Sequence, residues 1–88
     1  MTDLLRLGAE PDPAKRIRQR QGEKIRKTRQ LRQMSPSELA EQVGVDVSAI
    51  SHWETGRFAP RQHHQIAIAK ALDVPHSMIF GLDAEASA

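Results

Sequence analysis

Apolar residues recur along this chain at the three- and four-residue spacing of helices, and no stretch alternates with the two-residue period of a strand. Cap residues, prolines and glycines divide the pattern into short segments. The sequence therefore predicts an all-α fold, a compact bundle of about five short helices.

The first predicted helix runs from Pro13 to Arg32, because Asp12 is a good N-cap and proline suits the first helical position. Gly22 should weaken this helix midway. At about 100° per residue its apolar positions fall in one arc, which should be buried: Ile17, Ile25, Thr28 and Leu31. We expect residues 1–12 and 83–88 to be flexible tails around one domain, 13–82.

Two shorter helices follow, and their limits are well marked. Residues 35–38, Ser-Pro-Ser-Glu, combine a capping box with a proline, so a helix begins at Pro36, and Gly44 ends it. Asp46 can cap the next helix, and Gly56 ends that one. Two helices that cross after a tight turn need apolar or small residues where they touch and a glycine at the turn. These two segments have such residues at those positions: Leu39, Ala40, Val43, Gly44, Val45, Ile50 and Trp53. This is the pattern of a helix-turn-helix, whose second helix can enter a DNA major groove.

Two further helices are predicted, Arg61 to Leu72 and Pro75 to Phe80. In the first, Ile66, Ala69 and Leu72 form a row beside Ile68, which should face the core. In the second, the apolar residues are candidates for the core or for a partner surface: Met78, Ile79 and the following Leu82.

Charge is distributed unevenly along the chain. The 88 residues carry 13 Lys and Arg against 11 Asp and Glu, a net charge of +2. Between Ala14 and Gln33, however, nine basic residues accompany one acidic residue, Glu23. Such a block suggests a polyanionic partner, nucleic acid before membrane, and the alternative is a helix whose cations are only solvated.

Composition excludes several classes of function. Without cysteine there are no disulfides or thiolate metal sites, and no apolar run is long enough to span a membrane or act as a secretory signal, so we expect a cytoplasmic, nucleoid-associated protein. The adjacent His63 and His64 diverge on a helix and lack nearby ligands, so we expect no metal. No triad geometry or phosphate-binding glycine motif is present, so we expect no enzyme activity, cofactor or small-molecule substrate.

At this point the sequence resembles the lambda repressor and Cro family, also called the XRE family, from about Gly22 to Leu82. Residues 13–21 would then be a basic helical extension of the family core. The resemblance rests on the following residues: Gly22 to Arg26, Arg29, Ser35, Glu38 to Glu41, Gly44-Val45, Ile50-Ser51, Trp53-Glu54, Gly56, Pro60, Ala69 to Leu72, and Val74. It implies a five-helix bundle, transcriptional control, and a dimer on a pseudo-palindromic operator. It also implies an ion pair between Arg29 and Glu54, the alternative being two separately solvated charges.

Residues on the polar face of the helix after Asp46 are the candidates for reading DNA bases: Val47, Ser48, Ser51 and His52. The candidates for phosphate contacts are Ser35, Ser37, Arg57, Arg16, Arg18, Arg20, Lys24 and Lys27. Relatives often carry glutamine at the place of Pro36 and basic residues at the places of Val47, His52 and Phe58. We expect the basic stretch from Lys15 to Lys27 to compensate as an arm that contacts phosphates or an adjacent groove.

The sequence thus predicts a sequence-specific double-stranded DNA-binding transcription regulator, a homodimer that represses by occupying its operator. The alternative is a protein-interaction module, or an antitoxin-type partner-binding protein, that keeps this fold with weak or no specific DNA binding. The non-basic Val47, His52 and Phe58 motivate that alternative.

Overall fold

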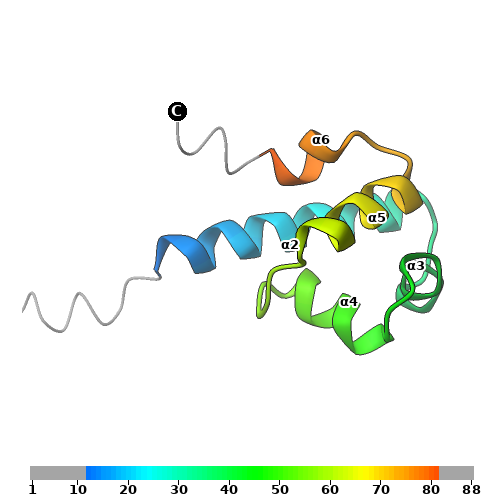
Figure 1. Ribbon diagram of the computed structural model, residues 1–88, viewed down its shortest axis with the longest axis horizontal. Coiled ribbons are helices and arrows are strands. Elements are labelled where there is room, and N and C mark those ends of the chain that lie inside the picture. The colour runs from blue at the N-terminus through cyan, green and yellow to red at the C-terminus, as the bar shows by residue number, and fades with distance from the viewer. Residues whose placement is uncertain (1–11, 82–88) are drawn as a thin grey trace, which may run out of the picture.

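The computed structural model describes residues 12–81, and over that range the chain forms five helices and no strand (Figure 1). The helices are α2 (Pro13–Leu31), α3 (Pro36–Val43), α4 (Val47–Glu54), α5 (Gln62–Leu72) and α6 (His76–Phe80). The predicted all-α bundle of about five helices is confirmed. The expected tails, except Asp12, and the core candidate Leu82 lie outside the described residues.

The predicted cap residues begin the first three of these helices. The Asp12 carboxylate accepts a hydrogen bond from the Ala14 N–H at 2.8 Å, and the Asp46 carboxylate accepts one from the Ser48 N–H. Before α3, Ser35 and Glu38 form both halves of a capping box. Each cap satisfies N–H groups that have no partner inside their helix, which is why local sequence placed these starts well.

A single apolar core holds the helices together. Six aliphatic side chains are fully buried: Ile25, Leu39, Ile50, Ile68, Leu72 and Ile79. Ala40, Trp53 and Phe80 complete the cluster, and Met34 and Val43 pack against its edge. Helix α2 packs against α4, α5 and α6, while α3 packs against α4 and α5. Every helix therefore contributes to one core.

Two expectations about the core are wrong. Leu31 is 82% exposed, and Ile66 is 44% exposed. The buried side of α2 includes Gln21, Gly22 and Arg29, and a search for apolar residues does not detect these three. The arc drawn through apolar residues alone was therefore rotated away from the true inner face, and Leu31 fell outside it.

Gly22 lies inside an unbroken helix, since α2 runs from Pro13 to Leu31. Its Cα lies against the backbone of the end of α4. A Cβ added there would stand 2.3 Å from the carbonyl oxygen of Trp53 and 2.5 Å from that of Glu54. Only glycine lets the two helices approach this closely, so Gly22 sets the position of α4 on α2.

The N-terminal part of α2 extends past the other helices (Figure 1). It contacts the turn after α4, where the Arg18 Nε donates to the Gly56 carbonyl at 3.2 Å and Gln19 lies against Gly56. The basic extension is thus part of a continuous helix attached to that turn. Among the described residues, no helix is both long and apolar enough to cross a membrane.

Candidate nucleic-acid interface

The turn between α3 and α4 fixes how α4 leaves the bundle. Gly44 has φ +85°, and its N–H and that of Val45 both donate to the Ala40 carbonyl, at 2.8 and 3.0 Å. This left-handed C-cap satisfies the end of α3 within three residues of the start of α4. Helices α3 and α4 consequently form a helix-turn-helix with α4 as its second helix.

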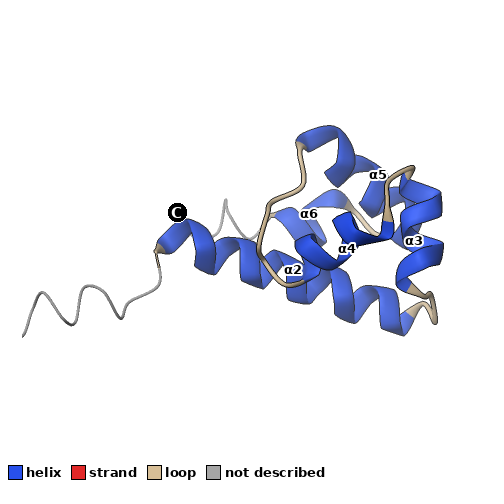
Figure 2. Ribbon diagram, turned by 90° about the horizontal axis from the view of Figure 1, so that it is seen from below, coloured by secondary structure: helices blue, strands red, loops and turns tan. Residues whose placement is uncertain are grey.

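Helix α4 has a buried side and an exposed side. Ile50 and Trp53 are buried, whereas the four predicted base readers lie on the outer surface: Val47, Ser48 and Ser51 are exposed and His52 is half-buried. Figure 2 views the molecule from the side on which α4 lies, with α2 behind it. The exposed side of α4 is narrow, largely polar and open to a partner.

His52 is half-buried, and it contacts the loop that follows α4. Its ring meets the Phe58 ring edge-on, with 5.3 Å between the centroids, and the Arg57 guanidinium lies 5.6 Å from the Phe58 centroid. Phe58 is 55% exposed. An aromatic contact of this kind limits the orientations of the imidazole, so His52 is presented to the surface in a restricted geometry.

Ser48 is bound to the cap residue of its own helix. Both its N–H and its hydroxyl donate to the Asp46 carboxylate. The hydroxyl bond, and then the N–H bond, hold the pKa of Asp46 below its ordinary value, so this exposed carboxylate stays ionised near neutral pH. With its proton committed, the Ser48 hydroxyl meets a partner as an acceptor.

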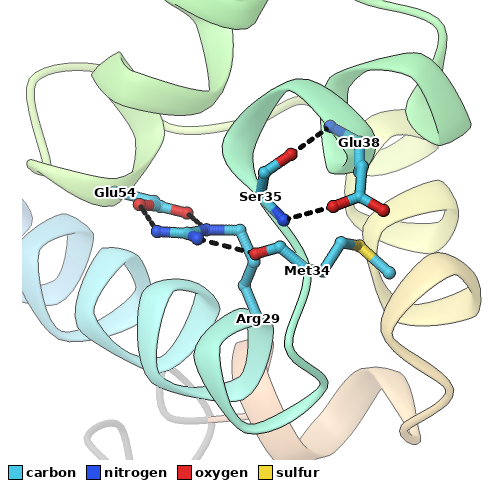
Figure 3. A network of polar contacts seen from close by, with 5 residues as sticks. All are labelled: Arg29, Met34, Ser35, Glu38 and Glu54. Atoms are coloured by element: carbon cyan, nitrogen blue, oxygen red, sulfur yellow. Dashed lines mark hydrogen bonds and ion pairs between the residues drawn. The ribbon is translucent and has the colours of Figure 1, made fainter.

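Arg29 connects α2 to α4 (Figure 3). Its Nε and one terminal nitrogen donate to the two oxygens of Glu54, at 2.7 and 3.1 Å, and its other terminal nitrogen donates to the Met34 carbonyl at 2.8 Å. The side chains of Arg29 and Glu54 are each 10% exposed. The hydrogen bond with Glu54 raises the pKa of Arg29, and the bidentate pair fixes the end of α4 against α2.

The first turn of α3 has few donors left for a phosphate. Pro36 has no N–H, the Glu38 N–H donates to the Ser35 hydroxyl, and the Ser35 N–H donates to the Glu38 carboxylate (Figure 3). These bonds also keep the pKa of the exposed Glu38 below its ordinary value. The Ser35 hydroxyl proton and the Ser37 groups remain as donors beside an ionised carboxylate, which repels phosphate.

The basic residues of α2 do not share one face. Relative to Gly22, which marks the side in contact with α4, Arg16, Arg20, Lys24 and Lys27 lie roughly 120–160° around the helix. Three of them, with Glu23, border a surface hollow that includes no residue of α4. Arg18 points inward to Gly56. Of the predicted phosphate contacts, the exposed Arg57 lies in the turn three residues after the end of α4.

Arg26 lies on the α4 side of α2. It falls within the basic stretch from Lys15 to Lys27 but is not among the residues predicted individually to contact phosphates. It lies roughly 40° from Gly22 around the helix. It borders a groove of about 400 Å³ that runs between α2, the start of α3 and the exposed side of α4, lined by Arg26, Pro36, Val47, Ser48, Ser51, Glu54 and Thr55. The Gly22 contact identifies this side of α2, but it is visible only once the helices are packed.

The histidines do not assemble a metal site in the described part of the chain, where no three metal-binding side chains come together. The rings of His63 and His64 lie 4.0 Å apart, and that of His64 lies 5.2 Å from the Trp53 ring. Burial, followed by the positive charges of His63 and Arg61, lowers the pKa of His64. His64 is thus a packing residue at the edge of the core.

Comparison with known proteins agrees with this geometry. Among solved structures, the Clp gene regulator ClgR from C. glutamicum has a similar fold, with a TM-score of 0.71 and 24% sequence identity over 90% of this chain and 97% of that chain. No curated protein sequence matches this chain. Residues 25–79, more than half of the chain, match the helix-turn-helix family model HTH_3. The chain therefore belongs to the helix-turn-helix family of the lambda repressor and Cro (XRE) type.

Proposed function

We propose that this protein is a sequence-specific, double-stranded DNA-binding transcription regulator that inserts α4 into the major groove. The observation that carries the proposal is the exposed side of α4, with Ser48, Ser51 and His52 beside the apolar Val47. Hydroxyls, an imidazole and a small apolar group match the polar edges and thymine methyls of that groove. The Gly22 contact and the Arg29–Glu54 pair hold α4 against α2.

We propose further that the regulator binds a pseudo-palindromic operator as a homodimer and represses by occupying it. Met78 on α6 and Ile66 on α5 are 53% and 44% exposed, and a two-fold dimer could bury apolar surface of this kind. Two-fold symmetry would place two α4 helices about 34 Å apart, one turn of DNA. Its place of action is then the nucleoid in the cytoplasm. The similar fold of the gene regulator ClgR supports a role in gene regulation.

Selection of bound duplexes from a random library, at a fixed salt concentration, tests the proposal. We expect enrichment of one sequence with two-fold related half-sites. Recovery of no preferred duplex would contradict specific DNA binding and favour the alternative, a protein-interaction module.

The selected duplex then allows a test of α4 itself. The double variant Ser51→Ala with His52→Ala should lose most of the preference for the selected duplex, while its binding to unrelated DNA changes little. The matched control is Ser77→Ala with His76→Ala, which removes the same two side-chain types from exposed positions of α6. Equal loss of preference in both double variants would contradict a reading role for α4.

Sedimentation of the complex at saturating duplex tests the stoichiometry separately. Two chains for each operator support the homodimer. One chain on a single half-site would overturn the homodimer and leave DNA recognition intact.

A further inference from the structure

The groove between α2, α3 and α4 is lined on one side by proposed base-reading residues of α4 and on the other by a charged residue of α2. Val47, Ser48 and Ser51 line it from the exposed side of α4, and Arg26 lines it from α2. A duplex that places base edges against α4 brings its flanking backbone to the rim of the same groove. The charge of this rim therefore decides whether a phosphate is held there.

Two charged side chains, Arg26 and Glu54, line the groove. The negative charge of Glu54 is balanced by Arg29, because both carboxylate oxygens of Glu54 accept hydrogen bonds from the Arg29 guanidinium. Arg26 is exposed and forms no hydrogen bond or ion pair within residues 12–81. The groove thus presents one uncompensated positive charge beside the side of α4 that would read bases.

The neighbouring first turn of α3 does not supply a comparable anchor. At its start Pro36 lacks an N–H, and the capping box uses the Glu38 N–H and adds the Glu38 carboxylate. A phosphate near Pro36 therefore meets few free donors from α3 and no cation, whereas Arg26 is the cation that borders the same groove.

We propose that Arg26 holds a DNA backbone phosphate at the rim of this groove and positions α4 over the bases. Its guanidinium can donate two parallel hydrogen bonds to phosphate oxygens. This inference rests on the proposed function, since it names the residue that positions DNA at the same site. It also replaces the sequence-based emphasis on Arg20, Lys24 and Lys27, which border a hollow that includes no residue of α4.

Comparing Arg26→Ala with Arg20→Ala tests the inference with matched changes of charge on one helix. Arg26→Ala should weaken binding of the selected duplex and of unrelated duplexes alike, by roughly tenfold, and reduce the slope of log K against log salt by about one. Arg20→Ala should change the affinity less than about twofold. Equal losses in the two variants would mean that only the general field of α2 acts, and would overturn the inference.

A duplex carrying one neutral methylphosphonate at a time identifies the contact. At one backbone position the wild-type protein should lose roughly tenfold in affinity, while Arg26→Ala, whose melting temperature should be unchanged, loses nothing more there. Arg26→Lys should keep the salt slope and part of the affinity. If no position distinguishes Arg26→Ala from wild type, the inference is wrong. If the wild-type protein binds no duplex, the proposed function itself is contradicted, and the inference about Arg26, which rests on it, is contradicted as well.

Discussion

Gly22 of α2 lies directly against the carbonyl oxygen of Trp53 at the end of α4, with no room for a side chain between them. The contact is between two backbones, so rotation of a flexible side chain cannot relieve a clash there. One residue type on one helix therefore controls how closely the proposed reading helix packs on the bundle.

Gly22→Ala should destabilise the protein by about 1–3 kcal/mol, because the strain of separating α2 from α4 exceeds the gain of about 1 kcal/mol in helix propensity. Urea unfolding measures the difference. Gln30→Ala, at an exposed position of the same helix, is the control and should change stability by less than about 0.5 kcal/mol. A Gly22→Ala protein more stable than wild type would contradict the close contact.

Arg29 and Glu54 should show strong energetic coupling. Glu54→Gln leaves a largely buried arginine without its ionic partner, and a double-mutant cycle with Arg29→Met should give a coupling energy of about 1–3 kcal/mol. The exposed residues Glu23 and Lys27, four apart on α2, provide the control cycle, which should give at most about 0.5 kcal/mol. Equal coupling in the two cycles would show that the pair has no structural role.

Stability should fall as the pH drops below 6.5, the ordinary pKa of histidine, because burial lowers the pKa of His64 in the folded protein. The unfolded chain then binds the proton more tightly, so acid favours unfolding in the range between the folded and unfolded pKa values. Urea unfolding at pH 7.5 and 5.5 measures this loss. His64→Gln should reduce the loss of stability between pH 7.5 and pH 5.5.

The C-caps of α3 and α5 make a reciprocal prediction. Gly44 and Asp73 both have positive φ, +85° and +58°, and each is followed by a valine whose N–H donates to a carbonyl of the preceding helix. Asp73→Gly should therefore stabilise the protein by about 0.5 kcal/mol through relief of left-handed strain, and Gly44→Asp should destabilise it by about 1 kcal/mol. Nothing lies within 4 Å of a Cβ at Gly44, so the backbone conformation alone is tested. Thermal unfolding shows whether the two changes have opposite signs.

Local sequence predicted the helix starts and the helix-turn-helix because their determinants are local. Ser35, Glu38 and Asp46 satisfy backbone groups two or three residues away, and Gly44 supplies its own left-handed conformation. The Arg29–Glu54 pair, which joins residues 25 positions apart, was expected only from the resemblance to the lambda repressor and Cro family. Capping rules contain no information about such a distant partner.

The remaining features depend on which side of α2 faces α4. Apolar periodicity placed Leu31 inside, because a buried glycine and the buried polar side chains of Gln21 and Arg29 carry no apolar signal. The same rotation hid Arg26, whose position beside α4 follows only from helix packing. Exposure of Leu31 and Ile66 likewise reflects the packing of whole helices, which spacing along one helix does not determine.

Backbone amide NMR shifts, recorded as the selected duplex is added, test most directly whether α4 is the reading surface. The account predicts the largest changes at Val47, Ser48, Ser51 and His52, with a second group at Arg26. Changes concentrated on α5 and α6, with the amides of α4 unmoved, would contradict it.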